Sequence, residues 1–188
     1  ILFFVALILI VAGVIAGFFI PVLGSRLWGV GLMVMAGWLL WRDIARKVIK
    51  VPGVTRFTAI SVLSGYVWLF MSGGLNMGFP AEVVGFAYDG IWHALFVGFV
   101  MTMIFGHAPI IVPALTSMMV RYRPTFYIPL VLLHISLLMR MHGDMAGNIL
   151  MRRLGGSINV AAIVLFLVLL VTSLEKLKRR ERKPRRDQ

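Results

Sequence analysis

The 188-residue chain contains no cysteine and only seven acidic residues. Without thiols it cannot form disulfides, thiolate zinc sites, cysteine-ligated iron–sulfur clusters or a cysteine nucleophile. Any cofactor must therefore be held by histidine, methionine, carboxylate or backbone groups. The scarcity of carboxylates and the absence of an inverted repeat also argue against a secondary transporter, although a proline-broken span is a feature that transporters share.

Apolar residues dominate what is present. They make up 60% of the chain, and the mean hydropathy is +0.94. An ordinary soluble domain is only about 45–50% apolar. A bilayer core about 30 Å thick needs roughly 20 apolar residues for each helical crossing. We therefore predict an all-α, polytopic transmembrane helical bundle with about six spans, forming one domain over residues 1–174.

The spans are delimited by short polar, glycine-rich or charged segments. We expect a tight turn at Gly24–Arg26, a helix-breaking stretch from Gly73 to Pro80, and an outer loop from His142 to Ser157. Pro109 and Pro113 are expected to kink the long fourth span, because each proline removes a backbone hydrogen bond. The predicted spans are 1–23, 27–41, 57–72, 90–120, 125–141 and 158–174.

The formal net charge of +12 is carried mainly by two short segments beside apolar runs. These are residues 42–56 and the tail, residues 175–188. Cations in such positions are typical of the cytoplasmic face of a membrane protein rather than of a nucleic-acid-binding surface. We predict a protein of the cell membrane with both termini inside and a basic cytoplasmic tail. Arg152 and Arg153, in the expected outer loop, are the exception to this charge pattern.

All four histidines lie in or beside the two neighbouring spans 90–120 and 125–141. They are His93, His107, His134 and His142. Ionisable residues within a bilayer are costly and usually functional, and histidine is the common axial ligand of haem. The alternative is that these side chains only hydrogen-bond between helices or lie at the membrane interface.

The spacing of the histidines suggests two levels in the membrane. His93 and His107 are fourteen residues apart, which in an α-helix places them about 40° apart around the axis and roughly 21 Å apart along it. This spacing resembles the paired-histidine helices of diheme b-type cytochromes. His107 and His134 lie at similar heights above the turn at residues 121–124, so we predict them as the inner ligand pair. His93 and His142 form the predicted outer pair.

Arg140 lies close to His142 in the sequence. A guanidinium there is suited to pairing with a haem propionate through charge-assisted hydrogen bonds. The alternative is an arginine that extends to the lipid headgroups. We predict Arg140 as a cofactor-binding residue, with this alternative left open.

Three short motifs resemble NnrS-type haem-containing membrane proteins and, more distantly, the central subunit of haem–copper oxidases. They are Trp92-His93-Ala94-Leu95, Gly106-His107-Ala108-Pro109 and Leu133-His134, within residues 88–144. The resemblance implies that histidines in successive spans hold haem and sometimes copper. Those families are typically about twice as long, and this chain lacks the full histidine set and copper-site pattern of an oxidase. Oxygen or nitric oxide reduction is therefore not implied.

The leading hypothesis is a haem b-binding electron-transfer or gas-responsive subunit of a respiratory-type redox system. It would carry one haem, or two if the outer pair also binds, and would contact lipid and other membrane or redox subunits but no nucleic acid. Methionine and histidine together suit Cu(I). Copper is nevertheless the less favoured cofactor, since methionine is also a routine apolar filler of membrane helices. The runner-up is a cofactor-free accessory subunit of a larger membrane complex, whose histidines merely pack helices.

Overall fold

The computed structural model describes residues 1–81, 85–116 and 118–176, and within them the regular structure is helical apart from one small ribbon. Along the first half of the chain the helices are α1 (Leu2–Gly17), α2 (Pro21–Arg42), α3 (Ala45–Val48) and α4 (Val54–Gly78). The second half contains α5 (Phe86–His93), η1 (Ala94–Met101), α6 (Thr102–Thr116), η2 (Pro124–Phe126), α7 (Tyr127–Met145) and α8 (Ile149–Thr172). The two strands are β1 (Met118–Val120) and β2 (Leu174–Lys176).

Five helices are long and apolar enough to cross a membrane. They are α2, α4, the continuous helix α5–η1–α6 over Phe86–Thr116, the helix Pro124–Met145 that joins η2 and α7, and α8. The remaining apolar helix, α1, has only 16 residues. It rises roughly 24 Å, which is less than the hydrocarbon thickness of about 30 Å. The predicted all-helical character is confirmed, and five helices are long and apolar enough to span a membrane, where about six spans were predicted.

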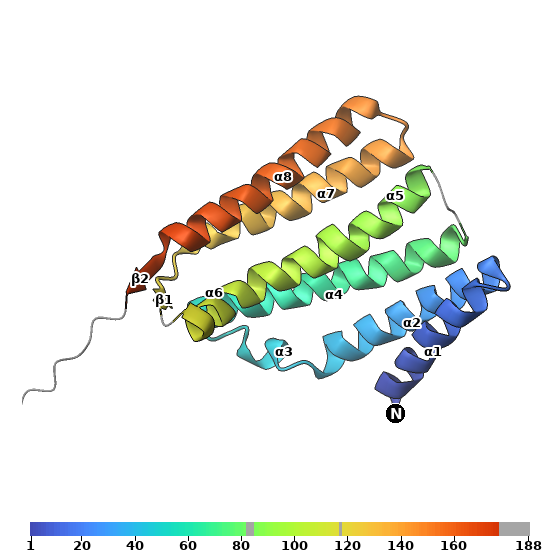
Figure 1. Cartoon of the computed structure of the whole chain (residues 1–188), viewed down its shortest axis with the longest axis horizontal. Coiled ribbons are helices and arrows are strands. Elements are labelled where there is room, and N and C mark those ends of the chain that lie inside the picture. The colour runs from blue at the N-terminus through green and yellow to red at the C-terminus, as the bar shows by residue number, and fades with distance from the viewer. Residues whose placement is uncertain (82–84, 117, 177–188) are drawn as a thin grey trace, which may run out of the picture.

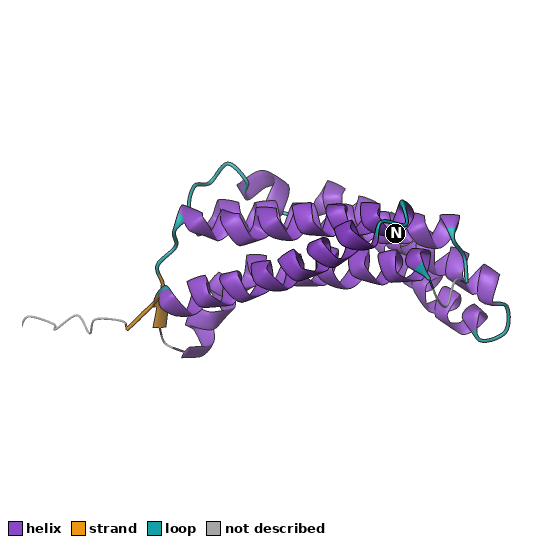
Figure 2. Cartoon of the chain, turned by 90° about the horizontal axis from the view of Figure 1, so that it is seen from above, coloured by secondary structure: helices purple, strands orange, loops and turns teal. Residues whose placement is uncertain are grey.

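The long helices lie side by side as antiparallel neighbours in the order α1, α2, α4, α5–α6, α7 and α8 (Figure 1). Seen from above, they form an elongated bundle with the strands at one extremity (Figure 2). The α2–α4 link containing α3, the end of α6 and the start of α7 lie towards this ribbon end. The α1–α2 and α7–α8 connections, the end of α4 and the start of α5 lie at the opposite end (Figure 1).

The ribbon joins the ends of α6 and α8. Strand β1 pairs with β2 in antiparallel register, Met119 opposite Glu175, and the Arg121 amide donates a 2.8 Å hydrogen bond to the Ser173 carbonyl. The predicted fourth span therefore ends at Thr116 instead of residue 120. The predicted basic tail begins within β2, and its residues 177–188 lie outside the described part of the chain.

The segment 142–157 is mostly helical, unlike the outer loop that its glycines suggested. Helix α7 continues to Met145 and α8 begins at Ile149. Gly143 and Gly155 lie where the two backbones touch, and a Cβ added to Gly155 would stand 2.6 Å from the Arg140 amide nitrogen. Small residues permit such close helix packing in membranes, so these glycines bring two helices together and do not end them.

Glycines mislead in the same way elsewhere. The expected turn at Gly24–Arg26 is helical, because Gly24 packs against Gly17 of α1, and the turn lies at residues 18–20 before Pro21. Gly73 faces Gly29 of α2, and α4 therefore continues to Gly78 beyond the predicted end at residue 72. Helix α2 begins at Pro21. Proline suits the first position of a helix, because the N–H group that it lacks would have no partner there in any case.

The fourth span is irregular before its prolines. Helix α6 runs through Pro109 and Pro113 to Thr116, whereas the eight residues Ala94–Met101 form a π-helix. In a π-helix each hydrogen bond reaches one residue further than in an α-helix, and such segments are rare and often found at functional sites. The span begins at Phe86, four residues before its predicted start. The angular arithmetic of an unbroken α-helix therefore does not apply between His93 and His107.

Candidate functional site

His134 is fully engaged by helix α4. Trp68 Nε1 donates to His134 Nδ1 at 2.9 Å, and His134 Nε2 lies 3.1 Å from Ser64 Oγ. Because Nδ1 accepts, the ring proton resides on Nε2 and is donated to Ser64. The Ser64 hydroxyl donates in turn to the Ser61 carbonyl at 2.9 Å. This arrangement leaves His134 no free nitrogen for a metal.

His107 lies on the exposed surface of α6, away from this chain of hydrogen bonds. Its Nδ1 is 2.8 Å from the carbonyl oxygen of Met103, one turn earlier. A carbonyl can only accept, so Nδ1 carries the proton and Nε2 keeps a free lone pair. The structure therefore does not form the predicted inner pair, since His134 turns towards α4 and His107 faces outward.

The surroundings of His107 are apolar. Exposed Ile104, Ile111 and Leu115 flank it along the same helix. A shallow groove of ≈ 410 Å³ lies beside the imidazole. Its lining consists of His107 and the apolar residues Val100, Met103, Ile104, Ala108, Ile111 and Val112. A polar ring is thus displayed within a surface that otherwise suits lipid or an apolar partner.

The predicted outer pair is not formed either. His93 Nδ1 lies 2.8 Å from the Asp89 carbonyl oxygen and 3.3 Å from Asp89 Oδ1. His142 is exposed near the end of α7. The four histidines occupy four different environments, and the described residues contain no group of three or more histidines and carboxylates able to hold a metal ion.

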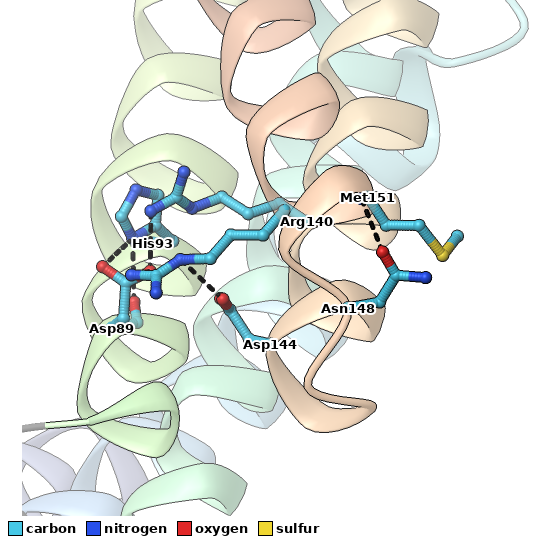
Figure 3. A network of polar contacts seen from close by, with 7 residues as sticks. Asp89, His93, Arg140, Asp144, Asn148 and Met151 are labelled. Atoms are coloured by element: carbon cyan, nitrogen blue, oxygen red, sulfur yellow. Dashed lines mark hydrogen bonds and ion pairs between the residues drawn. The ribbon is translucent and has the colours of Figure 1, made fainter.

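Arg140 joins a cluster of ionic side chains that connects three helices, and we call it the Asp89 cluster (Figure 3). Arg140 Nη2 lies 2.7 Å from Asp89 Oδ2, and Arg152 Nη2 lies 3.3 Å from the same oxygen. Arg152 Nε is also 2.9 Å from Asp144 Oδ1. The cluster consists of Asp89 and His93 of α5, Arg140 and Asp144 of α7, and Arg152 of α8. Arg140 thus has a protein partner in place of the predicted haem propionate.

The Asp89 cluster is balanced in charge and partly enclosed. Two carboxylates face two guanidinium groups, and the side chains of Asp144 and Arg140 are only 2% and 16% exposed. A buried charge without a partner is strongly unfavourable. Mutual pairing therefore lowers the cost of placing two carboxyl and two guanidinium groups in the packed end of an apolar bundle. The arrangement fits a cross-link between α5, α7 and α8 better than a vacant ligand site.

Sequence analysis missed both carboxylates of this cluster. Asp89 lies 51 positions before Arg140, and no local pattern pairs them. A signal was nevertheless present, because Arg152 broke the charge rule at the end expected to lie outside. An arginine inside that end of a membrane bundle needs a carboxylate, and Asp89 and Asp144 border the same end.

Comparison with known proteins identifies a family without assigning a role. No curated protein and no solved structure matches the chain. A family model matches residues 1–175, nearly the entire length. The chain therefore belongs to the family described as Domain of unknown function (DUF8744).

Proposed function

We propose that the protein is a membrane-integral haem b-binding subunit of a respiratory-type redox system, with His107 as an axial ligand. The observation that carries this proposal is the hydrogen bond from His107 Nδ1 to the Met103 carbonyl, which leaves Nε2 of a histidine in the wall of the apolar groove without a proton. Metal-ligating histidines commonly donate their other ring N–H to a backbone carbonyl in this way. Placing an isolated imidazole in an apolar membrane surface costs free energy, and residues placed in this way usually have a function.

The groove suits one face of a flat, apolar macrocycle. Its lining offers the His107 imidazole and apolar side chains, and haem bound there would supply one-electron transfer. Because His107 lies at the surface, another membrane subunit is needed to cover the other face of the group. Arg140 is committed to Asp89 at 2.7 Å, so a propionate partner comes from elsewhere in the complex.

Visible spectroscopy of the protein purified with its membrane partners tests this proposal. We expect a Soret band with reducible α and β bands, and loss of most haem content in His107→Ala. The matched control is His142→Ala. His142 is also exposed but lies outside the groove, so this variant should retain the haem. Equal haem content in both variants would exclude His107 as the ligand, and elemental analysis would reveal copper bound in its place.

A cofactor-free accessory subunit is the second candidate. The observation in its favour is that His134 is saturated by Trp68 and Ser64 while His93 is bound to Asp89. His134 used in this way joins α7 to α4, and His93 is held within its own helix, so neither histidine needs a cofactor to account for its contacts. A visible region without absorption bands in the intact complex would favour this function over haem binding.

For topology, we propose that both chain ends and the ribbon end of the bundle face the cytoplasm of a cell-membrane protein. Exposed Arg42, Arg46 and Arg123 lie at this end, where cations are expected on the cytoplasmic side. The rings of Phe3 and Trp38 are 5.1 Å apart, which brings the start of α1 to the end of α2. With the five long helices crossing and the end of α8 inside, α2 begins outside, so this orientation requires α1, packed against α2, to make a sixth crossing.

A further inference from the structure

A pocket of ≈ 370 Å³ lies where α2 ends and α3 begins, and we call it the α2–α3 pocket. Its lining consists of Trp41, Arg42, Asp43, Arg46 and Lys47. Three cations against one carboxylate give this lining a formal charge of +2. A concave surface with an excess of one charge concentrates ions of the opposite sign, so the pocket attracts anions.

The carboxylate of the pocket is already engaged by the protein. Asp43 Oδ1 accepts a hydrogen bond from the Ala45 amide at 2.7 Å, and Asp43 Oδ2 accepts one from the Tyr66 hydroxyl at 2.6 Å. These bonds hold the start of α3 beside the end of α2, which brings Arg46 and Lys47 into the same lining. None of the three cations forms an ion pair with a carboxylate in the described part of the chain.

The two arginines are held in place by Trp41. The Arg42 guanidinium carbon lies 4.4 Å from the centroid of the Trp41 ring, and Arg46 Nη1 donates to the Trp41 carbonyl at 3.1 Å. Stacking uses the face of a guanidinium group and leaves the N–H donors at its edge available, and the Arg46 bond uses only one of five donors. Guanidinium donors match the oxygens of a phosphate group. The pocket therefore offers several N–H donors to a phosphate.

The pocket lies at the depth of lipid headgroups. Helix α2 has 22 residues and rises roughly 33 Å, slightly more than the hydrocarbon core of about 30 Å. Its last turn therefore reaches the headgroups when α2 crosses the membrane. Trp41 is 58% exposed, and tryptophan is enriched at this level. Basic pockets beside membrane helices are suited to anionic lipid headgroups.

We propose that the α2–α3 pocket binds the phosphate of an anionic phospholipid headgroup. Arg42 and Arg46 donate hydrogen bonds to the phosphate oxygens, and Lys47 adds a third positive charge. A zwitterionic headgroup brings its own cation into a lining that is already positive, so it binds more weakly. This site is independent of haem binding, because His107 lies on α6 and contributes nothing to the pocket.

The test is titration of phosphatidylglycerol into the full-length chain in maltoside micelles, whose detergent carries no phosphate. Native mass spectrometry counts the lipids bound at each concentration. We expect saturable binding of the first lipid, with an affinity about fivefold or more above that for zwitterionic phosphatidylcholine. Equal affinities for the two lipids would overturn the proposal.

Removal of the three cations tests the pocket directly. Arg42→Gln/Arg46→Gln/Lys47→Gln alters only exposed side chains, and a glutamine in place of Arg46 can still donate to the Trp41 carbonyl. Each cation near a membrane surface contributes about fivefold to the binding of anionic lipid. We therefore expect the affinity for the first phosphatidylglycerol to fall about tenfold or more.

The matched control removes the same charge from exposed residues outside the pocket lining, in the variant Lys50→Gln/Arg121→Gln/Arg123→Gln. Exposed charges more than a Debye length away are largely screened, so this variant should bind the first lipid within about twofold of the unaltered protein. Unfolding midpoints in the same micelles check that both variants fold. Equal losses in the two triple variants would assign the binding to overall charge and overturn the proposal.

Asp43→Asn should change the affinity in the opposite direction. The substitution removes the one carboxylate of the lining, while the amide oxygen can still accept from the Ala45 amide. We expect phosphatidylglycerol to bind about threefold to fivefold more tightly. Weaker binding in this variant, with an unchanged unfolding midpoint, would contradict a phosphate in this pocket.

Two other anions are separated by the same measurements. Inorganic phosphate has the same oxygens but no acyl chains, so we expect no saturable binding of it at millimolar concentrations. Saturable phosphate binding that is lost in the triple pocket variant would assign the pocket to a soluble anion and overturn the lipid assignment. Unchanged lipid affinity in that variant would leave the pocket to an acidic partner protein and would also overturn it.

Discussion

The two ends of the bundle hold their charges in opposite ways. In the Asp89 cluster, Arg140 and Arg152 lie within 3.3 Å of carboxylates and are partly buried. At the ribbon end, cations are exposed and bond chiefly to backbone, as when Arg56 Nε donates to the Ile49 carbonyl at 3.1 Å. The ion pair of Arg121 with Glu175 at that end is exposed. Cations inside the packed bundle need carboxylate partners, whereas cations at its surface can outnumber the carboxylates near them.

Side-selective labelling should separate the two ends completely. The chain has no cysteine, so Lys47→Cys and Ala146→Cys each carry one reactive thiol. In sealed membranes a membrane-impermeant maleimide should modify position 47 only from the cytoplasmic side and position 146 only from outside, because the basic end is retained inside. Labelling of both positions from one side would contradict this topology.

Loss of the shared carboxylate should produce the largest change in stability. Asp89→Ala leaves Arg140 without its partner in a partly buried position, so we expect unfolding in detergent micelles to become about 3–5 kcal/mol easier. Denaturant or thermal unfolding measures the change.

The double variant Asp89→Ala/Arg140→Met removes both charges and is the matched control. It should recover much of the lost stability, because no uncompensated charge remains. A single variant as stable as the unaltered protein would show that the Asp89 cluster does not cross-link the helices.

The middle of the bundle should respond less strongly. His134→Phe removes the acceptor of Trp68 and the donor to Ser64, so we expect a loss of about 1–3 kcal/mol from the unsatisfied groups. Unfolding midpoints in the same micelles measure it, with exposed His142→Phe as the control. Haem content should be unchanged in His134→Phe, and its loss there would restore the inner ligand pair.

The exposed pair at the ribbon end should matter least. Arg121 Nη1 and Glu175 Oε1 are 3.5 Å apart, and both side chains are more than half exposed. Arg121→Gln should therefore change stability by no more than about 0.5 kcal/mol, with any effect fading in high salt. A loss comparable to that of Asp89→Ala would remove the distinction between the two ends.

The sequence was sufficient for the class of fold because long apolar runs have few alternatives to membrane helices. It was unreliable at helix ends, where Gly24, Gly73 and Gly155 suggested turns. These glycines instead allow backbones of different helices to touch, and that contact depends on partners the local sequence does not contain. The same holds for Asp89 and Arg140, whose pairing requires the packed arrangement of α5 and α7.

The placement of the histidines was predicted in part. Composition and position located all four histidines correctly in neighbouring helices, but pairing them required side-chain directions. His134 bonds to Trp68 on α4, a helix that no sequence pattern marks as its partner. For His93 and His107, the 100° step per residue assumes unbroken α-helix, and the π-helical segment between them violates that assumption.

The π-helix Ala94–Met101 affects how the family can change in length. An α-helix that gains or loses one residue turns everything beyond the change by about 100°, which would misplace either the Asp89 cluster or the Thr58 bond to the Gly106 carbonyl. A π-helical turn already holds one residue more than an α-helical turn. Relatives with one residue fewer within 94–101 should therefore have an ordinary α-helix there and keep both flanks in register, which makes this segment a tolerant position for single-residue deletions during evolution.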